Sequence, residues 1–230
     1  MAEFAASSAY FGVFVSLVAY MAGTSIKKKT GLAVMNPILL AVAMVIALLL
    51  LFDIPYEVYN QSARMISSLL TPATICLAVP LYEQLALLKK HKGAILAGIV
   101  SGVITSLVCV LALSALFKLD HASYVTLLPK SITTAIGMGV SEELGGYVSI
   151  TVAIILITGI LGNVIAETVC RIFRITEPVA RGVAIGTSSH AIGTAKALEL
   201  GSVEGAMSSL SIVISGILTV AGASLFAQFL

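Results

Sequence analysis

The sequence predicts an all-α integral membrane protein with about seven to eight transmembrane segments in two duplicated halves. Of the 230 residues, 59% are hydrophobic and only 10% are charged, and the mean hydropathy is +1.08. A soluble domain carries roughly 25% charged residues because its surface faces water, so lipid must cover much of this chain. Apolar runs of helix length recur along the sequence, and polar interruptions fall at corresponding places in both halves.

The first half contains four apolar runs, and a bilayer core of about 30 Å requires about 20 apolar residues per helix. The runs cover residues 8–25, 32–52, 65–88 and 94–117. Asn36-Pro37 opens the second run, and Pro72 and Pro80 interrupt the third. Because the N-terminal region contains an acid and no basic stretch, we expect the first run to be a membrane span rather than a cleavable signal peptide.

The second half repeats this rhythm at an offset of about 115 residues. Its segments cover residues 123–140, 148–173, 183–200 and 206–230. The first of them is weak, since it contains a proline, a lysine and several glycines, and the third is small and polar in its middle. The two long plain runs correspond to the second and fourth runs of the first half. Few residues are identical between the two halves, so the predicted duplication rests on the order of plain and interrupted segments.

Internal duplication with an interrupted segment at the same place in each half is typical of secondary transporters. We therefore expect one transmembrane domain over residues 1–230, built from two inverted pseudo-repeats at about residues 8–117 and 123–230. The interrupted or re-entrant segments are expected near residues 65–88, 123–140 and 183–200.

Three basic clusters predict how the chain crosses the membrane. Lysine and arginine concentrate on the cytoplasmic side, so Lys27–Lys29, Lys89–Lys92 and Arg171–Arg181 should lie on one side. Two crossings separate the first cluster from the second, which agrees. Three segments separate the second cluster from the third, so one of them should not cross. The weak segment 123–140 is the natural re-entrant candidate, which leaves seven crossings.

The densest polar cluster inside an apolar segment lies between residues 186 and 199. Polar groups are costly in lipid, which makes such residues functional candidates. Gly186 and Gly193 permit a helix break, and a broken helix exposes N–H groups that bind an anion. The candidate substrate-binding side chains are Thr187, Ser188, Ser189, His190, Thr194 and Lys196. A structural alternative stays open, in which small residues pack helices closely and Lys196 pairs with Glu199 near an interface.

A second polar cluster lies in the expected re-entrant segment. It consists of Pro129, Lys130, Ser131, Thr133 and Thr134. The proline frees backbone groups, and the lysine with the neighbouring hydroxyls could hold a carboxylate. The alternative is a lysine at a helix start whose side chain extends to the membrane interface.

Further candidates lie outside these two clusters. Pro72 and Pro80 predict helix breaks that would serve as gating or cradle elements. Asn163 and Glu167 lie one turn apart in the run 148–173 and, together with Glu199, are candidates for lining a cavity or coupling transport to an ion. Glu167 has an alternative partner, the arginine four residues later.

The sequence favours a protein that is not an enzyme and binds no cofactor or metal. Residues 186–190 spell Gly-Thr-Ser-Ser-His, which differs from the G-x-S-x-G motif of hydrolases. No P-loop, dinucleotide fingerprint or metal-ligand spacing is present. Cys76, Cys109 and Cys170 are far apart in apolar runs, which indicates buried structural thiols. Basic clusters between apolar runs are typical of membrane loops and not of a nucleic-acid-binding surface.

With these motifs the sequence resembles the LrgB/CidB family, which includes the YohK-type inner-membrane proteins. The resemblance covers essentially the whole chain. It is carried by Asn36-Pro37, Pro72–Thr74, Ala78–Tyr82, Pro129–Thr134, Gly186–Glu199 and Glu204–Ser209. One departure is Ala135, where the family has a proline. The resemblance implies a multi-pass protein of the bacterial inner or plasma membrane, related to the plastidic glycolate/glycerate translocator.

The resemblance also implies two functions. One is an antiholin-like role, which modulates murein hydrolase export and autolysis beside a smaller LrgA/CidA-type membrane partner. The other is transport of small carboxylates such as pyruvate, glycolate and glycerate. The residues themselves favour transport. A holin-like pore needs amphipathic helices that oligomerise, whereas this chain has duplicated halves and cationic, hydroxyl-rich interruptions.

The resulting hypothesis is a secondary transporter of a small carboxylate anion, with protons as a candidate coupling ion. Lys130 and Lys196 would offset the carboxylate charge, the hydroxyls of both clusters would bond its oxygens, and His190 would act as a proton switch. The expected partners are the lipid bilayer, the anion and further copies of the chain. The small-residue stretch Gly98–Gly102 predicts a helix contact within or between protomers.

Overall fold

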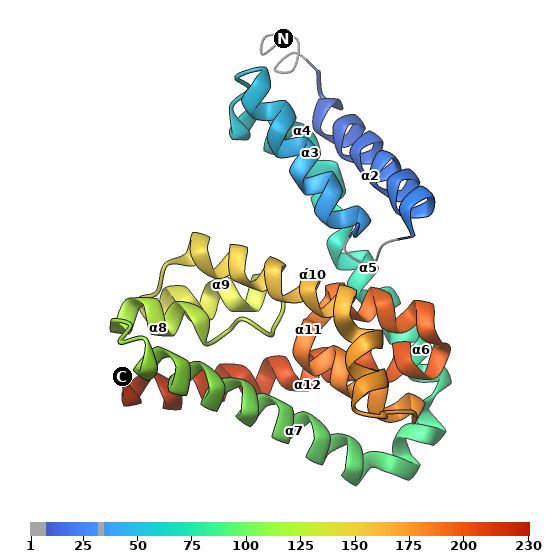
Figure 1. Ribbon diagram of the computed structural model, residues 1–230, viewed down its shortest axis with the longest axis vertical. Helices are drawn as coiled ribbons and strands as arrows, with labels where there is room; N and C mark the ends of the chain where they lie inside the picture. The colour runs from blue at the N-terminus through green and yellow to red at the C-terminus, as the bar shows by residue number, and fades with distance from the viewer. Residues whose placement is uncertain (1–7, 32–34) are drawn as a thin grey trace. The chain divides into compact units, whose positions relative to one another are not determined.

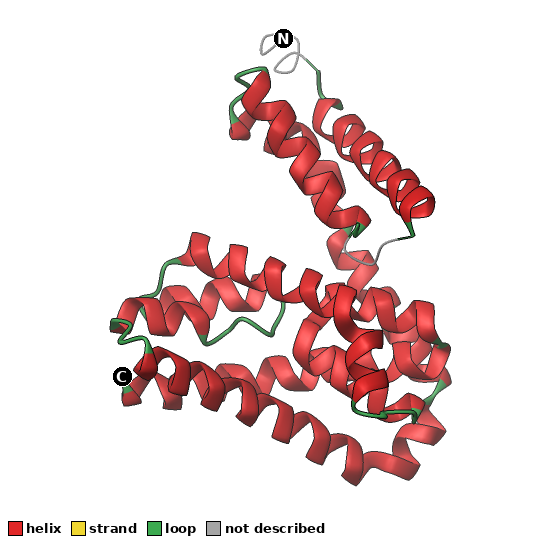
Figure 2. Cartoon of the chain, in the orientation of Figure 1, coloured by secondary structure: helices red, strands yellow, loops and turns green. Residues whose placement is uncertain are grey.

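The computed structural model describes residues 8–31 and 35–230, which fold into helices without a strand (Figure 2). The all-α fold class is therefore confirmed. Two short stretches lie outside the described residues. Residues 1–7 belong to the N-terminal region that the sequence analysis distinguishes from a signal peptide, and residues 32–34 begin the second apolar run. The chain forms two compact units, Met1–Cys76 and Leu77–Leu230, and each is described by itself.

The described helices of the first unit are α2 (Phe11–Thr30), α3 (Pro37–Leu51), α4 (Tyr56–Ser68) and α5 (Leu70–Cys76) (Figure 1). Asn36 caps α3, because its Oδ1 accepts hydrogen bonds from the N–H groups of Ile38 (2.8 Å) and Leu39 (3.3 Å). Pro37 occupies the first helical position, where a missing N–H costs nothing. Asn36-Pro37 thus starts a helix, as the sequence predicts.

Helix α2 packs closely on α4 through a glycine near its start. The N–H of Gly12 donates to Ser62 Oγ at 2.8 Å, and the hydroxyls of Ser16 and Tyr59 lie 2.7 Å apart. A Cβ atom at Gly12 would lie 2.6 Å from the carbonyl oxygen of Tyr59. Only glycine allows the two backbones to approach this closely.

The proline-containing segment 65–88 breaks into short helices, as predicted. Helix α4 ends at Ser68 and α5 ends at Cys76, each four residues before a proline. Because proline has no N–H, Pro72 and Pro80 cannot bond to the carbonyl groups of those two residues. The breaks therefore fall where the prolines remove a helical hydrogen bond.

The second unit contains the long helices and the interrupted ones. Its helices are α6 (Ala78–Glu83), α7 (Leu85–Leu116), α8 (His121–Leu127), α9 (Thr134–Glu143), α10 (Val148–Ile172), α11 (Pro178–Leu200) and α12 (Ser202–Phe226). Within the described residues, three helices are long and apolar enough to cross a bilayer: Leu85–Leu116, Val148–Ile172 and Ser202–Phe229. The shorter apolar helix is Pro37–Leu51. These spans support a membrane protein.

Helices α8 and α9 form a hairpin beside the first half of α10, which agrees with the re-entrant segment that the sequence predicts. Thr151 of α10 bonds to both helices: its Oγ1 lies 3.0 Å from the carbonyl oxygen of Thr126 and 2.7 Å from Ser141 Oγ. One turn further along α10, Ile155 packs near Gly137 of α9, which in turn lies near the Pro129 carbonyl. The chain therefore runs along α10 toward its middle in α8, turns at residues 128–133 and runs back in α9.

Helix α11 is a second hairpin, which approaches α10 from its opposite end. Its backbone breaks at His190, where φ is 43° and ψ is −140°. Both arms pack on the same stretch of α12, since Gly186 of the first arm and Thr194 of the second arm both contact Ser208. Segment 183–200 thus returns to the end from which it starts. The sequence prediction counts segment 183–200 as one of seven crossings, whereas in the structure this segment is a hairpin that does not cross.

The basic clusters at the start of α7 and after α10 lie at the same end of the second unit (Figure 1), and their location on the cytoplasmic side stays a prediction. Leu87 and His91, near the start of α7, line the same cavity as Ile175 and Pro178, which follow α10. The α8–α9 hairpin begins at the other end, where His121 Nδ1 is hydrogen-bonded to the backbone oxygen of Leu230. The two hairpins therefore approach each other from opposite ends.

A buried hydroxyl cluster predicts a stability effect. The Thr151 side chain is fully buried, so Thr151→Val leaves the Thr126 carbonyl and the Ser141 hydroxyl without this partner. Because an unsatisfied buried polar group costs about 1–3 kcal/mol, we expect a lower melting temperature of the detergent-solubilised protein. The matched control is Ser101→Ala, which removes an exposed hydroxyl that bonds only its own helix. Equal melting temperatures for the two variants would contradict this role of Thr151.

Candidate functional site

A cavity of about 1290 Å³ lies between α7, α10 and α11 at the place where the two hairpins meet. Lys130 and Ser131 line it from the turn between α8 and α9. Thr187, Ser188 and Ser189 line it from the end of the first arm of α11. The two polar clusters predicted from the sequence, which lie about 55 residues apart in the chain, thus share one cavity.

Helix α7 adds polar groups that sequence reasoning missed. Thr105, Ser106 and Cys109 line the cavity, and Ser106 Oγ lies 3.4 Å from Ser131 Oγ. Thr158 contributes another hydroxyl from α10. Single hydroxyls inside plain apolar runs give little signal. A spacing of three or four residues from Gly98 and Gly102 could have placed these α7 residues on one helix face.

Lys130 is the cationic group of this cavity. Its Nζ donates a hydrogen bond of 2.9 Å to Ser131 Oγ. Among the described side chains, ion pairs within 4.0 Å involve Lys196 alone, so no described carboxylate pairs with Lys130. Lys130 is also the only lysine or arginine among the described residues that line the cavity. An ammonium without a counter-ion favours an anionic ligand.

Thr187 supplies an unused hydrogen-bonding group. Its side chain is buried and lines the cavity, and its Oγ1 makes no hydrogen bond to a described residue. Buried hydroxyls nearly always have a partner, because leaving one unpaired is costly. By contrast, Ser188 Oγ donates to the carbonyl oxygen of Ala184 at 2.8 Å and lies 3.0 Å from Ser189 Oγ. Thr187 is therefore the hydroxyl of this arm that lacks a partner.

The turn of α11 is fixed to α10 by His190, which does not line the cavity. Its Nε2 lies 3.0 Å from the carbonyl oxygen of Ile155, and because a carbonyl only accepts, Nε2 carries the proton in this bond. The positive φ of 43° is unfavourable for a residue with a Cβ, at a cost of about 1–3 kcal/mol. The carbonyl of His190 accepts a bond of 3.0 Å from Thr194 Oγ1. The structure thus gives His190 a role in holding the turn.

Gly186 and Gly193, which the sequence predicts to break the helix, do not lie at the break in α11. The break falls at His190, between Gly186 and Gly193, and both glycines lie inside helical arms. A Cβ atom at Gly186 would collide with Ser208 of α12, and one at Gly193 would collide with Ser189. These glycines therefore provide close packing, and the surrounding contacts impose the break on a non-glycine residue.

Two glycines of α10 receive the turn of α11. A Cβ atom at Gly159 would lie 2.7 Å from His190 Cε1, and one at Gly162 would overlap the side chain of Ser189. The pair one turn apart creates a notch in α10. On the other side of α11, a Cβ atom at Gly102 would lie 2.7 Å from Thr187 Cγ2. The small-residue stretch of α7 thus makes a contact within the protomer.

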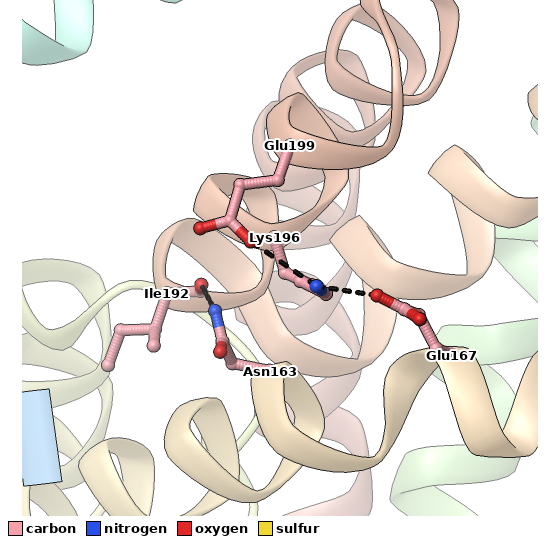
Figure 3. A network of polar contacts seen from close by, with 5 residues as sticks. All are labelled: Asn163, Glu167, Ile192, Lys196 and Glu199. Carbon is pink, nitrogen blue, oxygen red and sulfur yellow. Dashed lines mark hydrogen bonds and ion pairs between the residues drawn. The ribbon is translucent and has the colours of Figure 1, made fainter. Parts of the chain in front are cut away.

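Lys196 lies outside the cavity, in a polar network that ties the second arm of α11 to α10 (Figure 3). Its Nζ lies 2.5 Å from Glu167 Oε1 and 3.2 Å from Glu199 Oε2. Asn163 Nδ2 donates a hydrogen bond of 2.9 Å to the carbonyl oxygen of Ile192. The i,i+3 pair that the sequence allows is therefore present, and Glu167 pairs across the two helices.

The two remaining candidates for substrate binding lie at the start of α9 and outside the cavity. Thr133 precedes α9 and Thr134 begins it, and neither lines the cavity.

The prediction that all three cysteines are buried is wrong for Cys76 and Cys109, whose side chains are exposed, and right for Cys170. Within residues 8–31 and 35–230, no group of three histidine, cysteine, aspartate or glutamate residues could hold a metal ion.

Comparison with known proteins agrees with these motifs. A sequence model described as the LrgB-like family matches residues 16–229. The proteins named antiholin-like protein LrgB from Bacillus mycoides (strain KBAB4), Bacillus cereus (strain B4264) and Bacillus anthracis (strain CDC 684 / NRRL 3495) are each 37% identical over 222 residues, which is 96% of this chain and 96% of each relative. No solved structure matches. Because the match covers nearly the whole chain, the protein belongs to the LrgB-like family.

Proposed function

We propose that this chain is a secondary transporter, rather than an enzyme, and that it carries a small monocarboxylate such as pyruvate, glycolate or glycerate. The observation that carries the proposal is the unpaired ammonium of Lys130 among hydroxyls, at the meeting point of two opposed hairpins. Broken helices that approach a central site from both ends are typical of secondary transporters. In this proposal residues 1–230 act as one transport domain built from two pseudo-repeats.

The charge of the site supports a monoanion. Lys130 supplies one positive charge, whereas the charge of Lys196 is offset by Glu167 and Glu199. The hydroxyls of Ser131, Thr187 and the neighbouring serines can donate to carboxylate oxygens. Of the two lysines proposed from the sequence, Lys130 is therefore the stronger candidate for binding the anion.

The second candidate function is that of an antiholin-like modulator of murein hydrolase export and autolysis, acting with an LrgA/CidA-type membrane partner in the bacterial inner or plasma membrane. It is supported by the names of the relatives, which are 37% identical to this chain. The polar cavity supports transport instead, because a modulator without a substrate has no use for an unpaired ammonium there. Homo-oligomerisation and proton coupling through His190 stay predictions.

Uptake into proteoliposomes tests the transport proposal. The wild-type chain should accumulate radiolabelled pyruvate or glycolate above protein-free liposomes. Lys130→Met should weaken apparent substrate affinity about ten- to a hundredfold, because it removes a charge-assisted hydrogen bond worth about 1.5–3 kcal/mol. The matched control is Lys90→Met, an exposed lysine outside the cavity. The proposal fails if the wild type shows no uptake, or if Lys130→Met transports as well as the control.

A double-mutant cycle tests whether Lys196 holds the second arm of α11 or binds substrate. Lys196→Met leaves two carboxylates close together, whereas Glu167→Gln alone leaves Lys196 paired with Glu199. If the ion pair acts as a tether, the double variant should lose less uptake and less thermal stability than the sum of the single losses. If Lys196 binds the anion, Glu167→Gln should give no such relief, and additive losses would argue against the tether.

A further inference from the structure

The cavity has two parts of different chemistry. Its polar end lies where Lys130 and the hydroxyls meet. The rest is a mainly apolar arm, which runs between α7, α10 and the first arm of α11 and is lined by residues such as Ile95, Gly98, Ile165 and Val183. The apolar character of this arm has no role in binding a carboxylate of two or three carbons.

The size of the arm supports this distinction. From Thr105 to Ile95 the cavity follows α7 over ten residues, and at 1.5 Å per residue this is about 15 Å. A volume of about 1290 Å³ is more than a small acid needs, since drug-sized ligands occupy pockets of about 300–1,000 Å³. A short carboxylate at Lys130 would leave most of the arm to be filled by something else.

We propose that the site also binds monocarboxylates with a longer apolar chain, whose carboxylate contacts Lys130 and whose hydrocarbon lies along the arm. The inference rests on the proposed carboxylate site at Lys130 and extends its ligand class. The charge distribution supports one orientation. The only lysine or arginine among the described lining residues is at the inner end of the arm, and apolar side chains follow it toward the ends of α7 and α10.

The same geometry disfavours a bilayer phospholipid as the occupant. The arm leads to His91 and Glu177, at the end of the second unit where the basic clusters lie. A phospholipid keeps its headgroup at the membrane surface, so its alkyl chain would point inward and press hydrocarbon against the unpaired ammonium of Lys130. A free carboxylate places its charged group at the ammonium and its chain in the apolar part.

The native thiol of Cys109 reports occupancy independently of transport, because it lines the polar end of the cavity and is exposed. In proteoliposomes containing the Cys76→Ala, Cys170→Ala double variant, the rate of Cys109 alkylation by N-ethylmaleimide is measured against added acid. The probes are acetate, butyrate, hexanoate and octanoate. Burying one methylene group strengthens binding about fourfold. The acid concentration that gives half-maximal protection should therefore fall about fourfold for each added methylene until the arm is filled.

Two further arms of the experiment identify the occupant. Octan-1-ol has the same chain without the charge, so it should protect much less than octanoate, and Lys130→Met should remove that difference. Equal protection by octanol and octanoate would overturn the proposal in favour of unspecific hydrocarbon binding. Equal protection by octanoate and acetate would overturn it as well, because the arm would then contribute nothing.

Variants that fill the arm provide the structural test. Gly98→Leu should abolish the dependence on chain length but keep protection by acetate, since a Cβ atom there already lies 3.2 Å from Val183 Cγ1. The matched control is Gly93→Leu in the same helix, where a Cβ atom meets nothing within 4 Å. If Gly98→Leu is not monodisperse, Ala184→Leu, an exposed lining residue, fills the same arm. Unchanged dependence on chain length in a folded arm-filling variant overturns the proposal.

Pyruvate uptake by the same proteoliposomes separates this inference from the transport proposal. Uptake without any advantage of octanoate over acetate sustains the carrier and overturns the long-chain site. Protection that increases with chain length, without uptake, sustains the binding site and overturns the carrier. Neither uptake nor protection overturns both.

Discussion

The site depends on the way in which the turn of α11 rests in α10. His190 adopts an unfavourable backbone conformation there, and its imidazole donates to the carbonyl group of Ile155. Gly159 and Gly162 provide the space that the turn occupies. Without this notch the turn could not reach the middle of α10, and Ser188 and Ser189 would not share a cavity with Lys130. These two glycines therefore decide whether the polar groups meet, because a Cβ atom at Gly159 would collide with His190 and one at Gly162 would overlap Ser189.

What the sequence could predict followed local chemistry. Three of the apolar runs contain a helix long enough to cross a bilayer, and the breaks before Pro72 and Pro80 follow from a missing N–H, whatever the tertiary structure. The break in α11 does not follow this rule, because tertiary contacts place it at His190 and not at the neighbouring glycines. The partner of Lys196 was equally undetermined, since an ion pair with Glu167 requires that the second arm return beside α10.

Hydroxyl groups in the second unit divide into two kinds, which composition alone cannot separate. Ser209 and Ser211 of α12 bond to carbonyl groups of their own helix, so they serve as small residues that allow close packing. Thr187 lies on the facing helix, and its buried Oγ1 bonds to no described residue. A serine-rich helix in lipid is thus weak support for a binding site, whereas an unpaired hydroxyl in the same cavity as an unpaired ammonium is strong support.

The two lysines differ in whether a carboxylate of the chain offsets their charge. Lys196 has two carboxylates beside it, so its charge is offset whether or not a ligand is present. Lys130 has none among the described side chains, and closing its cavity without an anion would remove an ammonium from water at high cost. An anion at Lys130 neutralises the site and lowers that cost. For a carrier, movement of the hairpins would then be easier when loaded than when empty, which is the differential stability that coupled transport requires.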